Sequence, residues 1–386
     1  MKLNKNNSNL GSAKITQETI DDVIDEEKII EILIDNINIL EDLIKESPNE
    51  YKIEIYNSLK FKKNLPLRLN KHIEIFVLNS LNDIKKIFNY IEFRYKFEIC
   101  GKKKINLGYP PYLLIEPVSA CNLRCPFCFQ TDKSFTKKPF MGVMKFELFK
   151  EIIDEAESIG VGAITIASRG EPTMHKRFKD MLDYIGKNKF FETKINSNGS
   201  FLNEGICHAI FQNNITQIVI SADHYEKEKF ERLRLNSEFE KIVKNVDLLY
   251  NIRKNYYKNS ITEIRISGID ADNNLDKKKF KDFWIKRSDH VTAGLALERW
   301  DTYNNKINNN INDPCENLWD RMYIWFDGKA NPCDADYKSY LSYGDKKKNS
   351  IKEIWNGNHI NMIRSDHLNK KRIKHTPCNQ CGVTFV

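Results

Sequence analysis

The sequence predicts an α/β fold: a partial (β/α)6 TIM-like barrel, preceded by a helical extension and followed by a small cysteine-rich domain. Strand-like and helix-like segments alternate in six units within residues 111–300, which is the pattern of a parallel sheet with crossover helices. Residues 19–110 show mostly helical patterning, and residues 301–386 are rich in loops, short apolar segments and cysteines. A chain of 386 residues is long enough for this organisation, with residues 1–18 as a disordered tail.

The predicted strands are short runs of apolar and β-branched residues. They are Tyr112–Val118, Ala163–Ala167, Glu192–Ser197, Gln217–Ala222, Glu263–Ser267 and Val291–Leu297. Between them lie the predicted helices, Lys145–Ile159, Lys176–Lys187, Asn203–Gln212, Phe230–Arg253 and Lys277–Arg287. Parallel strands joined by helices require right-handed crossovers, and six units fit an open barrel better than a closed eight-stranded one.

The N-terminal extension carries no motif that predicts a function. Apolar spacing predicts an amphipathic helix over residues 19–46. The residues that follow are predicted to be mostly helical too, with strands as an alternative around Ile73–Val77 and Phe93–Ile99.

Composition excludes several classes of protein. The hydrophobic content is 41% and the charged content 30%, as in ordinary globular proteins, and no apolar run reaches the length of a membrane span. The N-terminus lacks the apolar core of a signal peptide, so we expect a cytoplasmic protein without a membrane partner. The net charge of +8 is spread along the chain without a basic block interleaved with aromatics, so nucleic-acid binding is not expected.

The nine cysteines are the most informative residues, because clustered cysteines in a long chain without a secretion signal are typical of metal binding. Cys100 and Cys207 stand alone and are predicted to be small buried apolar residues. The other seven fall into two groups, the first containing Cys121, Cys125 and Cys128 and the second Cys315, Cys333, Cys378 and Cys381.

The first group forms a C-x3-C-x2-C loop directly after the first predicted strand. Three thiolates can hold three corners of a cubane iron–sulfur cluster and leave one iron open for another ligand. A zinc site with a distant fourth ligand is the alternative.

With Phe127 between the last two cysteines, the loop resembles the hallmark of the radical S-adenosylmethionine (SAM) superfamily, C-x3-C-x-aromatic-C. The resemblance implies a [4Fe–4S] cluster on Cys121, Cys125 and Cys128, whose open iron is chelated by the amino and carboxylate groups of SAM.

Further motifs of the same family occur where other predicted strands end, which is the face of a barrel that carries chemistry. Gly170, Glu171 and Pro172 are similar to the family's Gly-Glu-Pro turn, which holds the SAM ammonium group. Arg169 stands where the family often has a second glycine, and it is a candidate for substrate binding.

The third and fourth strand ends resemble the Thr-Asn-Gly and Ser-x-Asp elements of the family. The matching residues, implied to bind SAM, are Asn196, Asn198, Ser221 and Asp223. Asn198-Gly199 is equally consistent with a simple turn. The arginine that binds the SAM carboxylate is implied to be Arg234, with Arg232 as the alternative.

The second cysteine group resembles the SPASM/twitch extension of radical SAM enzymes, which holds auxiliary [4Fe–4S] clusters. Full SPASM domains carry seven cysteines and two clusters, whereas this chain has four, which implies one auxiliary cluster. Four thiolates saturate a cubane, so this cluster is expected to carry an electron rather than to bind substrate. From the spacing alone, zinc stays an alternative.

The resemblance implies an enzyme in which a reductant such as flavodoxin or ferredoxin delivers one electron and SAM is cleaved to a 5′-deoxyadenosyl radical. The radical would abstract hydrogen from a small-molecule or peptide substrate. The expected reaction is a two-electron oxidation of a sugar- or aminocyclitol-type alcohol, with the auxiliary cluster as electron acceptor.

His224 is the candidate base for the proton lost in that reaction. Glu298, Arg299 and Asp301 are expected to face the substrate. The alternatives are a peptide-modifying radical SAM maturase, a radical epimerase and, from another class, a non-catalytic iron–sulfur or zinc protein.

Overall fold

The computed structural model describes residues 24–271, 274–295, 302–304 and 312–381. The predicted disordered tail and the three substrate-facing candidates after the last strand lie outside these ranges. The chain forms two compact units, one of residues 21–105 and one that contains all residues from 106 onward.

The first unit is built from helices in its described part. They are α1 (Glu26–Asp35), α2 (Ile37–Glu46), α3 (Glu50–Asn57), the π-helical turn η1 (Ser58–Lys62), α4 (Lys71–Asn79) and α5 (Ile84–Lys103). The helix predicted over residues 19–46 is therefore interrupted, at Asn36, whose side chain donates to the carbonyl of Ile32 at 2.8 Å.

The alternative of strands in this unit is wrong, because both segments are helical. Asn70 and Asp83 accept hydrogen bonds from backbone N–H groups at the starts of α4 and α5. These N-caps stabilise the first turn of each helix. Phe76, in one of these segments, packs between α4 and α5 instead, where its ring stacks on that of Tyr90 with the ring centres 3.7 Å apart. Tertiary packing outweighs strand propensity in this unit.

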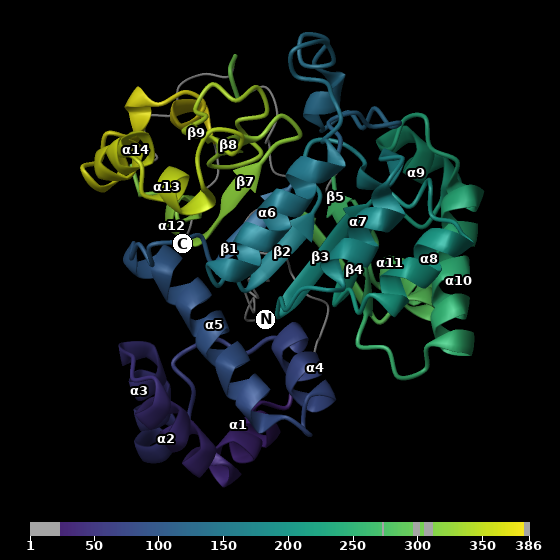
Figure 1. The fold of residues 1–386 in the computed structure, drawn as a ribbon. Coiled ribbons are helices and arrows are strands. Elements are labelled where there is room, and N and C mark those ends of the chain that lie inside the picture. Colours follow the sequence, from purple (N-terminus) through teal and green to yellow (C-terminus); the bar gives the residue numbers. More distant parts are fainter. Residues whose placement is uncertain (1–23, 272–273, 296–301, 305–311, 382–386) are drawn as a thin grey trace. The chain divides into compact units, whose positions relative to one another are not determined.

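The second unit contains the partial barrel, whose strands and helices alternate along the chain (Figure 1). The strands are β1 (Tyr112–Ile115), β2 (Ala163–Ile166), β3 (Glu192–Ser197), β4 (Gln217–Ser221), β5 (Glu263–Asp270) and β6 (His290–Leu295). The helices are α6 (Phe146–Ser158), α7 (Phe178–Ile185), α8 (Glu204–Gln212), α9 (Lys227–Leu233), α10 (Phe239–Tyr256) and α11 (Lys277–Trp284), with the short turns η2 (Phe129–Thr131), η3 (Pro172–Met174) and η4 (Ile285–Arg287).

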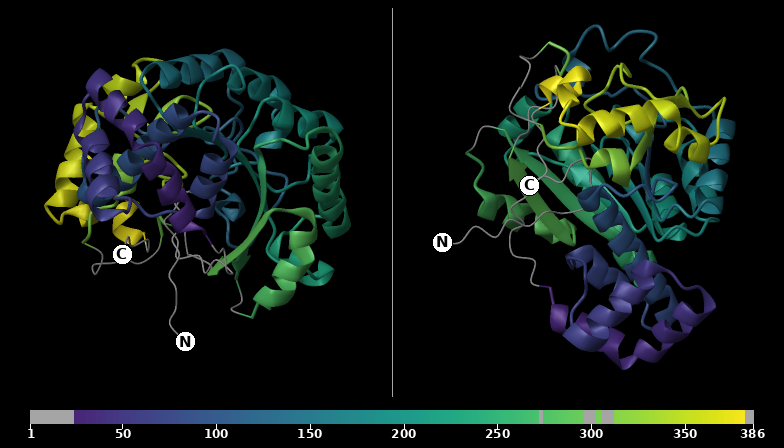
Figure 2. Two further views of the ribbon diagram at one scale, coloured as in Figure 1. Left: turned by 90° about the horizontal axis from the view of Figure 1, so that it is seen from below. Right: turned by 90° about the vertical axis from the view of Figure 1, so that its left-hand side faces the viewer.

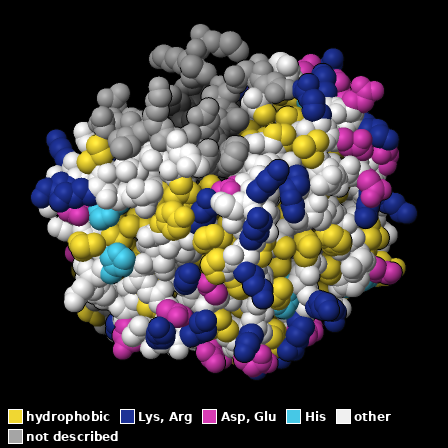
Figure 3. Space-filling model, turned by 90° about the horizontal axis from the view of Figure 1, so that it is seen from above, with side chains coloured by type: hydrophobic (Ala, Val, Ile, Leu, Met, Phe, Trp, Pro, Cys, Tyr) yellow, Lys and Arg dark blue, Asp and Glu magenta, His cyan; other side chains and the backbone are white. Residues whose placement is uncertain are grey.

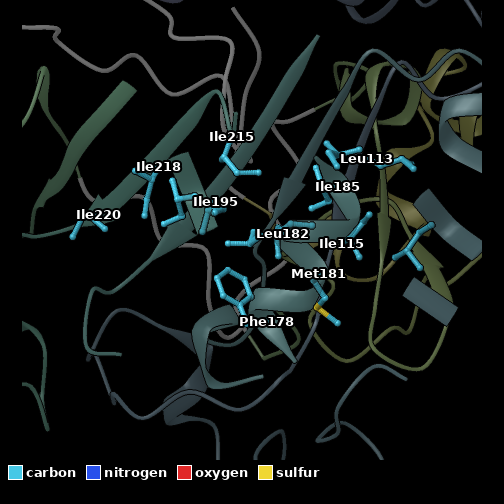
Figure 4. Close-up of a cluster of buried hydrophobic side chains, with 14 of the residues drawn as sticks. Leu113, Ile115, Phe178, Met181, Leu182, Ile185, Ile195, Ile215, Ile218 and Ile220 are labelled. Carbon is cyan, nitrogen blue, oxygen red and sulfur yellow. The ribbon is translucent and has the colours of Figure 1, made fainter. Parts of the chain in front are cut away.

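The six strands pair in parallel in sequence order, which confirms the predicted α/β fold. The view from below shows the sheet curving, with the helices of this unit along its outer side (Figure 2). The outward strand faces are apolar: Ile195 and Ile218 belong to the same buried core as Phe178 of α7 (Figure 4). Alternate residues such as Lys194 and Arg265 point the other way and are also buried, so the barrel interior is polar.

The tail region extends the same sheet. It contains α12 (Asn317–Asp320), β7 (Met322–Ile324), β8 (Lys329–Asn331), β9 (Gly344–Asp345), α13 (Ile351–Trp355), α14 (Asn358–Leu368), η5 (Arg372–Lys374) and η6 (Cys378–Gln380). Strand β7 pairs in parallel with β1, and β8 and β9 follow in antiparallel order. The barrel and the tail region therefore belong to one continuous sheet.

Within the described ranges, the helices include none that combines the length and apolar character needed to span a bilayer. On the face of the molecule shown in Figure 3, Lys and Arg side chains lie among Asp and Glu side chains.

Candidate active site

The first cysteine group lies on the loop after β1. The Arg124 side chain stabilises this loop, because it donates hydrogen bonds to the backbone carbonyls of Cys121 and Leu123, each at 2.7 Å. The Cys128 N–H donates to the Cys125 carbonyl at 3.0 Å. Phe127, in the aromatic position of the motif, is half-buried on the same loop.

The three thiols lie close enough to act on one another electrostatically. Burial raises the pKa of Cys121 to about 11 and that of Cys128 to about 12, and Cys125 adds to both shifts. Arg234 lowers the pKa of all three thiols. Buried thiols with raised pKa values need a cationic partner before they ionise, and a cluster iron is such a partner.

Among the described residues, no three His, Cys, Asp or Glu side chains are placed so that they could hold a single metal ion.

Gly170 brings the turn after β2 against the cysteine loop. A Cβ atom at this position would lie 2.2 Å from the Val118 carbonyl oxygen, so only glycine allows this approach. The next residue, Glu171, donates its N–H to the Ala120 carbonyl at 3.0 Å, and Pro172 begins η3.

The carboxylate of Glu171 is bonded within the protein. It accepts hydrogen bonds from the Ser197 hydroxyl at 2.8 Å and from the Asn198 N–H at 2.7 Å. Burial raises the pKa of this carboxyl group, although the hydrogen bonds oppose the shift. In this structure Glu171 ties the turn after β2 to the end of β3, and its direct contact with the SAM ammonium group stays a prediction.

Asn198 and Asn196, at the end of β3, play different parts. The Asn198 amide donates to Asn122 Oδ1 at 2.8 Å and to Cys121 Sγ at 3.7 Å, which steadies the cysteine loop. The Asn196 Oδ1 atom is buried and has no hydrogen-bond partner among the described residues. A buried acceptor without a protein partner needs water or a ligand as its partner, and SAM is a candidate for this role.

Ser168 was not predicted to bind a ligand, yet it shows two unusual features. Its Oγ atom is buried and has no partner in the described part of the chain, and its backbone φ is +136°. Non-glycine residues rarely adopt such a conformation, and strain of this kind gathers at functional sites. Only its place at the end of β2, before the Gly-Glu-Pro turn, could have indicated this from the sequence.

The fourth strand end places Asp223 beside Arg234. Their side chains form a buried ion pair at 2.8 Å, and Asp223 also accepts the Ile269 N–H at 2.9 Å. Arg232, the alternative, is exposed on α9. Ser221 ends β4 and is half-buried. The structure thus places Arg234, not Arg232, next to the thiols.

His224 is buried beside a small cavity that Asp223, Lys229 and Arg232 also line. Burial lowers the pKa of its imidazole, so the ring is neutral near pH 7. Its Nδ1 atom accepts the Glu226 N–H at 2.9 Å, which leaves the ring proton on Nε2. In this tautomer neither ring nitrogen has a free lone pair, so the role of His224 as the base stays a prediction without geometric support.

Arg169, the candidate for substrate binding, is bonded within the protein, and contact with a substrate stays a prediction. The side chain is buried and forms an ion pair with Glu116, and it donates to the Tyr337 carbonyl at 2.7 Å. Its guanidinium also lies 4.4 Å from the centre of the Trp325 ring. Arg169 therefore links the turn after β2 to the tail region.

The four cysteines of the second group also come together. Burial raises the pKa of Cys333 well above its usual value, and Cys378, Cys381 and Cys315 add to that shift. Cys381 likewise raises the pKa of Cys315, although the two residues lie far apart in the sequence. One loop, one hairpin and one terminal turn thus supply four thiols to a single site.

His367 and Arg372 surround this tail site. The His367 Nδ1 atom accepts the Cys315 N–H at 3.2 Å, while its Nε2 atom is buried without a hydrogen-bond partner among the described residues. The guanidinium of Arg372 lowers the pKa of Cys315 and Cys378. Four thiols with an adjacent cation and a buried N–H donor fit an anionic iron–sulfur cluster.

Comparison with known families agrees with this geometry. The profile of the radical SAM superfamily matches residues 115–280, and that of the SPASM iron–sulfur cluster-binding domain matches residues 315–382. The chain belongs to the radical SAM superfamily and carries a C-terminal SPASM domain. Its cofactors are accordingly a SAM-binding [4Fe–4S] cluster, SAM and auxiliary iron–sulfur.

Several individual proteins are similar to this chain. It is 33% identical over 113 residues to the tungsten-containing aldehyde ferredoxin oxidoreductase cofactor-modifying protein of Pyrococcus furiosus, over 29% of this chain and only 30% of that protein. It is 25% identical over 323 residues to a cysteine-type anaerobic sulfatase-maturating enzyme of Clostridium novyi, over 69% of this chain and 84% of the enzyme. The crystal structure of Streptococcus suis SuiB bound to precursor peptide SuiA has a similar fold, with a TM-score of 0.57 and 16% identity, over 94% of this chain and 88% of SuiB.

Proposed function

We propose that this radical SAM enzyme catalyses a two-electron oxidation of its substrate, in which the tail site accepts an electron. The observation that carries the proposal is the gathering of four thiols at the tail site and three at the barrel site. Four thiolates complete the coordination of a cubane, whereas three leave one iron open. The barrel site is therefore suited to SAM and the tail site to electron transfer.

The reaction balances with these two sites. When bound, the barrel cluster and SAM supply a 5′-deoxyadenosyl radical, which takes one hydrogen atom from the substrate. The substrate radical would then pass one electron to the tail site and release one proton to water, which would make the overall change an oxidation by two electrons. A one-electron carrier such as flavodoxin or ferredoxin is the expected source of the initiating electron.

The protein contributes position and seclusion. Asn198 and Gly170 hold the cysteine loop against the ends of β2 and β3, and the unpartnered Asn196 Oδ1 and Ser168 Oγ atoms can bond SAM there. Arg234 can bind the SAM carboxylate, because it lies beside the thiols.

Two substrate classes are compatible with the polar barrel interior. A sugar- or aminocyclitol-type alcohol is the expectation from the family resemblance. A peptide or protein substrate has separate support, because the alignment with the sulfatase-maturating enzyme extends over 84% of that enzyme.

The test uses full-length protein reconstituted anaerobically and reduced with dithionite in the presence of SAM. One set of assays contains aminocyclitols, and the other contains synthetic peptides whose sequences are encoded by genes next to that of the enzyme. The readouts are the amount of 5′-deoxyadenosine and a substrate mass that is lower by two hydrogens. We expect the double variant Cys378→Ala/Cys381→Ala to keep forming 5′-deoxyadenosine but to lose the oxidised product. Cys207→Ala removes a buried thiol outside both groups and is the matched control.

The electron-acceptor role is wrong if the double variant oxidises substrate as well as the wild type does. Absence of 5′-deoxyadenosine from reconstituted wild-type protein in both sets of assays would instead support the non-catalytic alternative.

A further inference from the structure

Arg372 occupies an unusual position beside the tail thiols. It lies in η5, which precedes the turn η6 that carries Cys378, and its side chain is only 2% exposed. Its Nη1 atom lies 3.4 Å from the Asp313 carbonyl, two residues before Cys315. The arginine is thus built into the core of the cysteine site, next to two of the segments that supply thiols.

Among the described residues, the four tail cysteines have the largest effect on the pKa of Arg372. Burial alone would lower the pKa of its guanidinium, but Cys315, Cys381, Cys378 and Cys333 outweigh this effect and raise it. A guanidinium stays protonated in proteins at any ordinary pH, so the site contains a fixed positive charge.

A fixed cation changes the redox behaviour of a buried cluster. A cubane with four thiolate ligands is an anion, and reduction adds one further negative charge. Coulomb attraction to a neighbouring cation is stronger for the reduced form, and the low dielectric of the interior increases the difference. The cation therefore favours reduction of the cluster, which raises its reduction potential.

His367 supports the same interpretation of the site. Because Nδ1 accepts the Cys315 N–H, the ring proton resides on Nε2, which is a buried donor without a protein acceptor in the described ranges. Hydrogen-bond donors near cluster sulfurs also raise the reduction potential. The surroundings of the tail thiols are therefore adapted to a reduced, electron-carrying cluster rather than only to holding metal.

We infer that Arg372 raises the reduction potential of the tail cluster and thereby tunes it as an electron acceptor. Arg372 is a positioning residue in this scheme, because it acts through the cluster and not on the substrate. The inference rests on the proposed function, which assigns an electron-carrying cluster to the tail site.

The experiment compares Arg372→Gln and Arg372→Lys with the wild type as full-length, anaerobically reconstituted proteins. Iron content establishes whether both clusters are loaded, and a redox titration followed by electron paramagnetic resonance gives the potential of each. Arg364→Gln is the matched control, since Arg364 is a buried arginine of the tail region whose side chain donates to the carbonyls of Leu318 and Trp355.

We expect Arg372→Gln to shift the tail potential to more negative values and to leave the barrel potential unchanged. Arg372→Lys, which keeps the charge, should restore most of the shift, and Arg364→Gln should cause none. An unchanged tail potential in a loaded Arg372→Gln protein would overturn the inference. So would an equal shift in the Lys and Gln variants, because the charge would then not be responsible.

If Arg372→Gln does not load the tail cluster, Arg372→Lys decides the question: a tail potential close to the wild-type value supports the role of the charge, and a markedly more negative one overturns it. The same experiment can contradict the proposed function without contradicting the role of Arg372. A loaded Arg372→Gln protein with a lowered potential but unchanged product per SAM cleaved would support the Arg372 inference and contradict electron acceptance by the tail cluster.

Discussion

The two thiol sites are built on opposite principles, although each has a buried arginine beside it. At the barrel site, Arg234 is paired with the carboxylate of Asp223 at 2.8 Å, and the buried polar atoms of Asn196 and Ser168 have no described partner. At the tail site, the four cysteines are the described residues that raise the pKa of Arg372. In the proposed function, the barrel site receives SAM as a further ligand and the tail site carries an electron.

The difference shows how clusters held by cysteine thiolates can serve two functions, ligand binding and electron transfer. Removing one thiolate from the ligand set opens a coordination position, and the surrounding polar atoms then select what fills it. Completing the set closes the cluster, and the surrounding charges then set its potential.

The largest predicted effect tests the barrel side of the comparison. The triple variant Cys121→Ala/Cys125→Ala/Cys128→Ala should lose all 5′-deoxyadenosine formation, because SAM would have no open iron. Two cubanes predict about eight irons per chain, so iron content after reconstitution should fall by about half. Retention of full iron, or of SAM cleavage, would show that these thiols do not hold the SAM-binding cluster.

The second prediction concerns the link between the two sites. Glu116→Gln would leave the buried Arg169 without its carboxylate partner, although Glu116 also accepts the Phe326 N–H at 3.1 Å. Losing one member of a buried ion pair costs about 3–5 kcal/mol, so the urea midpoint should fall markedly.

The matched control for this variant is Lys179→Met, which breaks an exposed pair with Asp183 that has an N–O distance of 3.5 Å. An exposed pair contributes about 0.2–1 kcal/mol. Equal midpoints for the Glu116 and Lys179 variants would mean that the barrel and the tail region are not joined through Arg169.

The sequence predicted more of the barrel than of the sites. Each barrel strand was predicted within a few residues, because β/α alternation is a local pattern, and β3 matches its predicted bounds of Glu192–Ser197. The N-terminal strands were wrong because helix caps at Asn70 and Asp83 and packing between helices outweigh local propensity. The partners of Arg169 could not be predicted, since they lie 53 and 168 residues away and spacing carries no information about such contacts.

The third prediction tests the close approach of the turn after β2 to the cysteine loop. Gly170→Ala would place a methyl group 2.2 Å from the Val118 carbonyl oxygen. We expect a loss of stability of about 1–3 kcal/mol, as for other overpacked sites, and weaker SAM binding measured by equilibrium dialysis. Gly205→Ala is the control, because the nearest atom to its Cβ would be 3.5 Å away. SAM affinity equal to that of the wild type would contradict the proposed packing.

The smallest predicted effect depends on pH and compares two carboxylates near Tyr337. Asp336, on the tail side, accepts the Tyr303 hydroxyl at 2.7 Å, and burial raises its pKa to about 7. Burial alone would raise the pKa of Asp132 as well, but hydrogen bonds from Lys338 and Ser134 lower it below the usual value. Near neutral pH, therefore, only Asp336 of these two groups should titrate.

Because Asp336 has a higher pKa in the folded than in the unfolded chain, the folded state binds more protons between the two values. Stability is thus lost as the pH rises toward about 7. Asp336→Asn resembles the protonated carboxyl. Its melting temperature relative to the wild type should therefore rise as the pH increases from about 5 to about 7, and the difference should then stay constant. Asp132→Asn should instead lower the melting temperature by a nearly constant amount over this range, since the Asp132 carboxylate is ionised throughout. A gap between Asp336→Asn and the wild type that does not change with pH would show that the buried carboxyl is not the titrating group.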